Sequence, residues 1–327
     1  MSINDEFNRF IRDNLALSQK DISVKVKSRE WLINRVTSKI KEKSDCPQLY
    51  KENGLEYITF GSYFKGTKVS DVDEFDILLI IDSNGGYFNV GGKRIGDGVG
   101  IINPNPKYYS KYKKENDTEF VSPRKIMNWL KSIIDEVLEP LGGEPGEKDG
   151  QAVTAYIKSQ DLYIDFVPGG IFKKVNSEDI FYAIPKGDAA GGWIMTNPRV
   201  DKEIVNTIGS KYWQFKNSIR LFKYIFQQSY KVKIGSYAVE SAHIDFEKNY
   251  YFYDDFKRDF LNILDHIITL VSNKKIPDMR DESINLIEGI NCETCLERLN
   301  KIRCKFLALD ENSYILKQDV YSFLRNE

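Results

Sequence analysis

The chain has 327 residues, 41% hydrophobic and 29% charged, with a formal net charge of −1. This length is typical of two lobes, and the near-zero charge argues against a dedicated nucleic-acid binder. Four cysteines and two histidines exclude a disulfide scaffold and disfavour His-rich zinc sites, so a reducing, cytoplasmic compartment is expected. No apolar run is long enough for a membrane span and no signal peptide is recognisable, so no membrane partner is expected.

The first forty residues predict helices. Trp31, Leu32, Val36 and Ile40 recur near helical spacing. The segment from Lys20 to Lys43 carries eight basic and three acidic residues. We interpret this excess as a solvated helix face, with a nucleic-acid surface as the alternative.

The sequence pattern of the next segment is typical of β-strands. Apolar runs predict strands at 57–60, 75–81, 153–157 and 162–167, with a Gly-rich hairpin insertion at 83–100. A helix is predicted after Ser122 and Pro123, which have the residue types of an N-cap and a first helical position.

A Pro/Gly stretch at 184–198 is the best candidate for a lobe boundary, and apolar residues beyond it recur at helical spacing. The predicted fold is therefore α+β: residues 1–200 form a core lobe with N-terminal helices, and residues 201–327 form a helical lobe. Three cysteines of the second lobe lack an evident fourth zinc ligand and are interpreted as core residues: Cys292, Cys295 and Cys304.

Chemistry is indicated by the segment from Gly61 to Asp76. Glu74 and Asp76 are two apart on a predicted strand, so their carboxylates lie on one face. Paired carboxylates suit a hard divalent cation. The Gly61-Ser62 turn upstream offers backbone N–H groups and a small hydroxyl to a phosphate.

Asp165 is the candidate for a third carboxylate because it interrupts an apolar strand. An ionised aspartate there is costly unless it is paired or binds a cation. A buried, hydrogen-bonded aspartate is the alternative, and the acidic pair upstream favours the metal ligand. Asp71 and Asp73 precede the apolar strand and are interpreted as solvated turn residues.

Gly61-Ser62, then Glu74 and Asp76, then a distant Asp165, resembles the polymerase β-type nucleotidyltransferase superfamily, and within it the cyclic GMP-AMP synthase, oligoadenylate synthase and bacterial CD-NTase group. The resemblance implies a bilobal core with a mixed sheet. It also implies two Mg²⁺ or Mn²⁺ ions held by the three acids, and ATP with GTP or other NTPs as substrates.

The resemblance extends into the second lobe. Segments 181–186 and 192–198 are similar to the family's interlobe region, where Thr196 would reach a base edge. By the same resemblance Lys223 and Ser236 would contact the triphosphate and Tyr237 would stack on a base. The alternatives for Lys223 and Tyr237 are a surface lysine and a core tyrosine.

Two departures limit what the resemblance implies. Residues 208–217 contain no cysteine or histidine, so the zinc insertion that positions double-stranded DNA in the animal enzyme is absent and DNA sensing is not implied. Ile194 follows Trp193 where the animal enzyme has an arginine used for guanine.

The leading hypothesis is an enzyme that makes a cyclic di- or trinucleotide. This product would be a second messenger that binds an effector protein in anti-phage defence. Ser62 and Lys223 would hold the donor triphosphate, and Asp165 would accept the proton of the attacking hydroxyl. The alternatives are a polynucleotide or tRNA nucleotidyltransferase and a non-catalytic, nucleotide-binding protein of the same fold.

Overall fold

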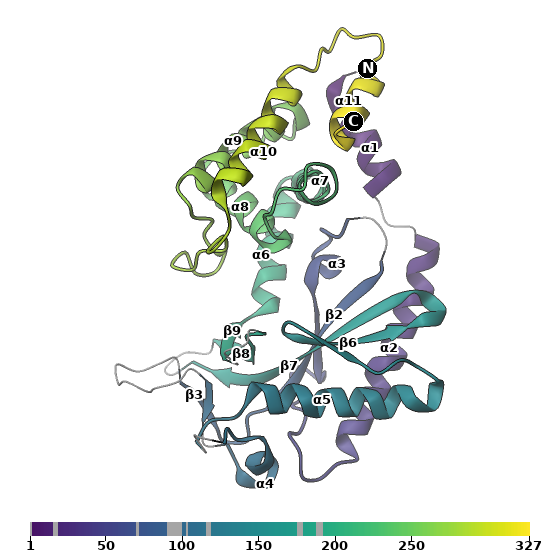
Figure 1. Ribbon diagram of the computed structural model, residues 1–327, viewed down its shortest axis with the longest axis vertical. Coiled ribbons are helices and arrows are strands. Elements are labelled where there is room, and N and C mark those ends of the chain that lie inside the picture. The colour runs from purple at the N-terminus through teal and green to yellow at the C-terminus, as the bar shows by residue number, and fades with distance from the viewer. Residues whose placement is uncertain are drawn as a thin grey trace. The chain divides into compact units, whose positions relative to one another are not determined.

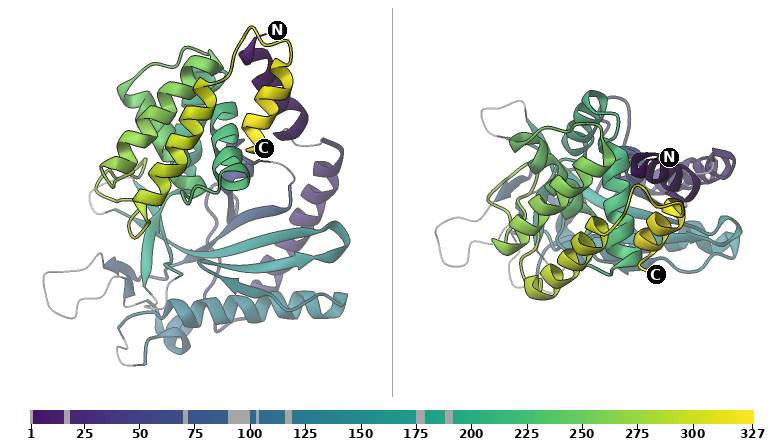
Figure 2. Two further views of the ribbon diagram at one scale, coloured as in Figure 1. Left: turned by 45° about the horizontal axis from the view of Figure 1, so that its top comes forward. Right: turned by 90° about the horizontal axis from the view of Figure 1, so that it is seen from above.

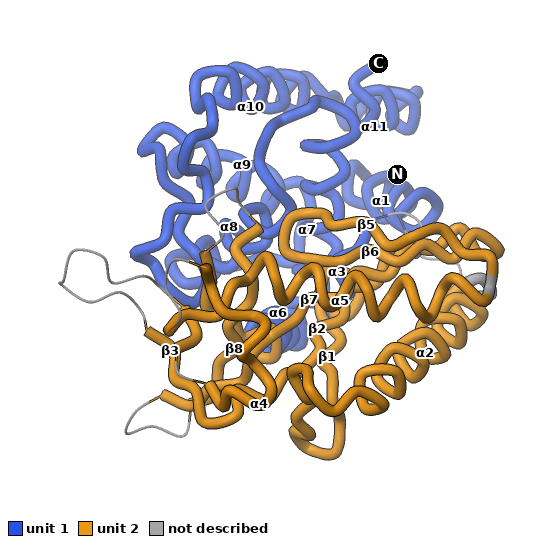
Figure 3. Tube along the Cα trace, turned by 60° about the horizontal axis from the view of Figure 1, so that its bottom comes forward, with its two compact units in different colours: residues 1–17, 65–71, 201–327 blue, residues 18–64, 72–200 orange. Residues whose placement is uncertain are grey.

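The computed structural model describes residues 2–15, 19–69, 72–89, 100–102, 104–115, 119–174, 179–187 and 192–327. The chain divides into two compact units, coloured separately in Figure 3. Residues 18–64 and 72–200 form what we call the sheet unit, and residues 1–17, 65–71 and 201–327 form the helical unit. The N-terminal helix and the short segment 65–71 thus group with the second unit, whereas the sequence prediction placed all of residues 1–200 in the first lobe.

A mixed seven-stranded sheet organises the sheet unit (Figure 1). Its order is β1-β2-β7-β6-β5, and β8 pairs with both β7 and β9. The β2–β7 pair is parallel, and the other pairs are antiparallel. The strands are β1 (Tyr57–Phe60), β2 (Glu74–Asp82), β5 (Glu147–Asp149), β6 (Ala152–Ile157), β7 (Leu162–Lys173), β8 (Ile180–Pro185) and β9 (Trp193–Thr196).

The predicted hairpin insertion contributes a separate antiparallel pair, β3 (Tyr87–Asn89) with β4 (Gly100–Ile102). Residues 90–99 of that insertion lie outside the described part of the chain, as does Asp71 of the predicted turn.

The helices of the sheet unit include α5 (Pro123–Leu138), which packs on the sheet, and α2 (Gln19–Lys41), which packs on α5. The unit also contains α3 (Gly61–Lys65) and α4 (Pro106–Tyr109), with 3₁₀ turns at Ser110–Tyr112, Glu139–Leu141 and Lys158–Gln160. α5 packs on β5, β6, β7 and β8. As predicted, Ser122 caps α5, and its hydroxyl accepts the Lys125 N–H at 3.3 Å.

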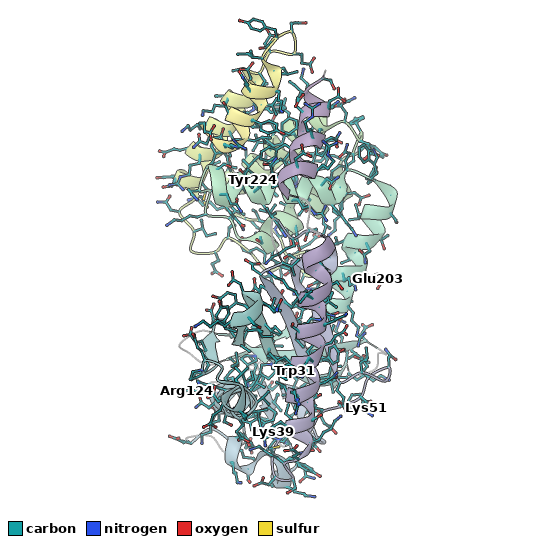
Figure 4. The ribbon with its side chains drawn as sticks, turned by 90° about the vertical axis from the view of Figure 1, so that its right-hand side faces the viewer. Trp31, Lys39, Lys51, Arg124, Glu203 and Tyr224 are labelled. Atoms are coloured by element: carbon teal, nitrogen blue, oxygen red, sulfur yellow. The ribbon has the colours of Figure 1, made fainter. Side chains whose placement is uncertain are left out.

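The buried stripe of α2 does not include Trp31. Leu32, Val36 and Ile40 are buried as their spacing predicts, but Trp31 is 39% exposed on this helix (Figure 4). Trp31 precedes Leu32 by one position, about 100° around a helix, and therefore leaves the buried stripe. The Arg35 guanidinium lies over the Trp31 ring, 5.5 Å from the ring centroid.

The helical unit is held together by an aromatic core. Its helices are α1 (Ile3–Phe10), α6 (Pro198–Lys211), α7 (Phe215–Tyr224), α8 (Ser236–Asn249), α9 (Phe256–Ser272), α10 (Cys292–Leu307) and α11 (Leu316–Arg325), with π-helical turns at Ile11–Leu15 and Ile225–Ser229. The ring of Phe7 lies 5.8 Å from that of Phe260 and 6.0 Å from that of Phe306. These contacts place α1 in the core, and Figure 2 shows it in purple beside α11 in yellow.

The cysteine prediction holds only in part. Cys295 is buried and Cys292 is half-buried against the core, but Cys304 is exposed and the prediction of a core position is wrong for it. The buried stripe of α10 runs through Cys295, Leu299, Ile302 and Phe306, and position 304 falls on the opposite side. Within the described residues, no helix combines the length and apolar character that crossing a membrane requires.

Candidate active site

Two neighbouring parallel strands bring the three predicted acids together. Glu74 and Asp76 begin β2 and share one face, and the register places Asp76 directly beside Asp165 of β7. Carboxylate oxygens of Glu74, Asp76 and Asp165 all lie within 4.8 Å of one another. Among the described residues this is the one group of three or more acidic, histidine or cysteine side chains so arranged.

Gly61 makes room for this cluster. It has a φ of +79°, and a Cβ built on it would lie 1.7 Å from Asp76 Oδ2. A side chain at this position would therefore be strained and would collide with a carboxylate of the cluster. Gly61 also begins α3, and Ser62 follows it as the second, half-buried residue of that helix.

Thr154 orients Asp165 and was not predicted from the sequence. It lies opposite Asp165 on β6, and its hydroxyl donates to Asp165 Oδ1 at 2.6 Å. Burial raises the pKa of Asp165 to about 6, the Thr154 hydrogen bond opposes this shift, and the neighbouring Glu74 carboxylate adds to it. The carboxylates thus repel one another in a partly desolvated place.

These residues fit a divalent cation. All three offer oxygen ligands, the donor type that Mg²⁺ and Mn²⁺ prefer. A cation would also offset the cost of burying the Asp165 carboxylate and its repulsion by Glu74, which together raise the pKa of Asp165. The structure therefore contains a candidate metal centre of the composition predicted from the sequence.

The opposite face of the same strands is anchored in the core. Phe75, between Glu74 and Asp76, is fully buried, and its ring lies 4.9 Å from that of Tyr63. The Arg29 guanidinium of α2 lies 4.8 Å from the centroid of the Phe75 ring. The acidic face is thus backed by packed side chains that fix the strand.

In the helical unit, Lys223 lies in a buried ionic network that the sequence did not indicate. Its ammonium donates to Glu240 Oε1 at 2.5 Å and to Thr67 Oγ1 at 3.2 Å. Glu240, 1% exposed, also accepts from Lys65 and, at 2.6 Å, from the Thr67 hydroxyl. Burial alone would raise the pKa of Glu240, but the two ammonium groups outweigh it and lower that pKa. The network ties residues 65–67 to α7 and α8.

The other residues suggested by the resemblance have these surroundings. Ser236 opens α8 and its hydroxyl accepts from Gln227 at 2.7 Å. Tyr237 is half-buried, burial raises its pKa, and the Lys65 ammonium lies 5.4 Å from its ring centroid. Thr196 ends β9 opposite Tyr182. Their roles toward nucleotides stay predictions.

Thr154 and Glu240 could have been found only with the three-dimensional pairing in hand. Thr154 becomes relevant because the β6–β7 register sets it against Asp165. Glu240 follows Tyr237 by almost one helical turn, and its spacing alone does not reveal two buried lysines.

Comparisons with known sequences agree with this geometry. A family model described as the Mab-21 protein nucleotidyltransferase domain matches residues 63–178. A probable cyclic nucleotide synthase of Bacillus cereus (strain VD146) is 24% identical over 271 residues, which are 83% of this chain and 78% of that protein. Cyclic GMP-AMP synthase of Mus musculus is 22% identical over 272 residues, which are 67% of this chain and 50% of that protein.

Solved structures show the same fold over the whole chain. CdnC of E. coli MS115-1 with ATP has a TM-score of 0.70 at 13% identity, covering 100% of this chain and 98% of CdnC. CdnC in its complex with HORMA-deltaN has a TM-score of 0.69 at 12% identity, covering 99% of this chain and 97% of CdnC. The mixed sheet with helices and the additional helical lobe predicted from the sequence are confirmed. Residues 63–178 therefore resemble a Mab-21 nucleotidyltransferase domain, and the chain is similar in sequence to a probable cyclic nucleotide synthase of a bacterium and to cyclic GMP-AMP synthase and shares the fold of CdnC.

Proposed function

We propose that this protein joins nucleoside triphosphates, ATP among them, into a cyclic di- or trinucleotide. The observation that carries the proposal is the convergence of Glu74, Asp76 and Asp165 on one face of two parallel strands. Similarity to a probable cyclic nucleotide synthase supports the cyclic product, and the fold shared with CdnC solved with ATP supports the substrate class.

The reaction is the attack of a ribose hydroxyl on the α-phosphorus of a second nucleotide, with pyrophosphate as the leaving group. Two Mg²⁺ or Mn²⁺ ions held by Glu74, Asp76 and Asp165 would supply Lewis-acid stabilisation of the charge on the reacting oxygens. Asp165, held at Oδ1 by Thr154, would accept the proton of the attacking hydroxyl. For a cyclic dinucleotide, a second transfer, after the linear intermediate has turned around, would close the ring; a cyclic trinucleotide would need a third.

Residues outside the acidic cluster would bind and orient the nucleotides. Ser62 and the backbone of the Gly61 turn would donate to the triphosphate, as would Ser236. Lys223 would do so by exchanging Glu240 Oε1 for a phosphate oxygen. Tyr237 would stack on a base.

The wider setting of the reaction is proposed on the same resemblance. The sheet unit and the helical unit would act as the two functional lobes of a cytoplasmic enzyme. Its product would be recognised by a separate effector protein in defence against phage.

The test is incubation of the purified protein with the four NTPs and Mg²⁺ or Mn²⁺, then phosphatase treatment and mass spectrometry. Phosphatase-resistant cyclic nucleotides are expected from the parent and not from the Glu74→Gln/Asp76→Asn variant. Glu147→Gln, which removes an exposed acid from edge strand β5, is the matched control and should keep the parent rate. An acidic-pair variant as active as the parent would refute the metal assignment, and linear, RNA-dependent products would favour a polynucleotide nucleotidyltransferase.

A further inference from the structure

A pocket of about 510 Å³ lies within the helical unit, apart from every residue assigned above to catalysis. It is formed by the end of α8, the segment 250–255 and the outer side of α9, elements labelled in Figure 1. This volume lies within the range of small-molecule sites. Its lining combines aromatic rings with a few polar groups, as ligand sites do.

Three tyrosines give the pocket aromatic walls that the fold leaves in solvent. Tyr250, Tyr251 and Tyr253 are 54%, 74% and 49% exposed. Tyr250 is supported from behind, because its ring stacks on that of Phe246 at 5.1 Å and meets the His266 ring edge-on at 5.5 Å. Such rings offer flat faces to a planar ligand.

Arg258 gives the pocket a positive charge without a compensating carboxylate. Its guanidinium lies 3.3 Å from the Tyr253 ring centroid, and within the described part of the chain it has no hydrogen-bond acceptor or ion-pair partner. The carboxylate and the imidazole of the lining are already paired: Asp265 with Arg303 at 2.7 Å, and His266 with Asp245 at 2.8 Å. A guanidinium stacked on a ring keeps its N–H edge available for an oxyanion.

We propose that this pocket is a second nucleotide site, which binds a nucleoside monophosphate unit with its base against the tyrosines and its phosphate on Arg258. The tyrosines suit a ligand with a planar ring, and Arg258 suits an anionic oxygen group on the same ligand. The choice of a nucleotide among such ligands rests on the proposed function, because nucleotides are what a nucleotide-joining enzyme meets. Free nucleotides and the nucleotide units of a cyclic product share this chemistry.

The first experiment locates the site. The full chain, without divalent cations, is photo-cross-linked to 8-azido-AMP, and the modified peptides are identified by mass spectrometry. Cross-links within residues 246–269 are expected in the parent and equally in the Glu74→Gln/Asp76→Asn variant. Cross-links confined to other segments would overturn the proposal.

The second experiment tests the chemistry by calorimetric titration. Arg258→Gln should weaken AMP binding about tenfold while leaving adenosine unchanged. Lys257→Gln is the matched control, since it removes an equal charge one residue away, from a lysine paired with Glu311 at 3.0 Å. An equal loss of affinity in both variants, or inorganic phosphate binding as well as AMP, would overturn the proposal.

Titration with cyclic di-AMP beside AMP distinguishes the two sources of the ligand: tighter binding of the cyclic compound indicates the product, and tighter binding of AMP a free nucleotide. The two proposals also fail separately. A chain that binds AMP in this pocket but makes no product refutes only the proposed function, and an active chain without AMP binding here refutes only the second site.

Discussion

Replacing Glu240 with glutamine removes a buried negative charge while keeping the shape of the side chain. In the parent, the Glu240 carboxylate faces Lys65 and Lys223, whose side chains are 10% and 3% exposed. Glutamine still accepts the Thr67 hydroxyl but leaves two buried ammonium groups without a counter-charge. Breaking a buried ion pair on one side costs about 3–5 kcal/mol, and we expect Glu240→Gln to lower the free energy of unfolding by at least about 3 kcal/mol.

The assay is urea unfolding of the full chain at neutral pH. Glu282→Gln is the control, because Glu282 pairs with Lys248 in the same unit but both side chains are exposed, at 69% and 42%. It should change the unfolding free energy by less than about 1 kcal/mol.

A second substitution tests the electrostatic reason for the loss. Lys223→Met should destabilise the parent, because it removes one partner of Glu240, yet it should stabilise the Glu240→Gln variant by removing an unpaired ammonium group. A loss below about 1 kcal/mol for Glu240→Gln, or the same effect of Lys223→Met in both backgrounds, would refute the reasoning.

Three other substitutions probe the acidic cluster, a buried histidine and the N-terminal helix. Gly61→Ala should reduce nucleotide joining about a hundredfold by displacing a carboxylate, whereas Gly54→Ala, at a glycine with φ +82° and open space around it, should keep the parent rate. Burial lowers the pKa of His243 to about 4, so the contribution of this residue to stability falls as the pH drops below its pKa in the unfolded chain, near 6.5. Between pH 7.5 and 5, the free energy of unfolding of the parent, measured in urea, should therefore fall by about 2 kcal/mol more than that of His243→Gln. Phe7→Ala, at a fully buried ring, should lower the unfolding free energy by about 3–5 kcal/mol, and a loss below about 1 kcal/mol would contradict the assignment of α1 to the helical core.

Local patterns were enough to predict the elements that carry the acids. A strand from 75 to 81 and the two-residue spacing of Glu74 and Asp76 fix a shared face, because side chains alternate along a strand. Asp165 stood out because a carboxylate within an apolar strand needs a partner. These inferences depend on neighbours in the sequence.

What the sequence could not provide were pairings between distant segments. The parallel register of β2 and β7, which sets Asp76 beside Asp165, joins strands separated by a hairpin insertion and α5. The same limit applies to Glu240, which is 175 positions from Lys65. Lys223 was assigned to a phosphate by resemblance, and only the structure reveals its carboxylate partner.

The acidic cluster of the sheet unit is electrostatically unfavourable without a cation. Carboxylate oxygens of Glu74, Asp76 and Asp165 lie within 4.8 Å of one another. Burial, together with the charge of Glu74, raises the pKa of Asp165 to about 6. Gly61 holds a left-handed backbone at the same point, where a side chain would collide with Asp76. A close backbone approach and like-charge repulsion that coincide at one place in an otherwise packed sheet are typical of functional sites. The metal assignment therefore depends on the chemistry of this unit alone, whereas the cyclic product depends on resemblance to other synthases. Binding of Mn²⁺ without turnover would accordingly support the first and leave the second to the product assay.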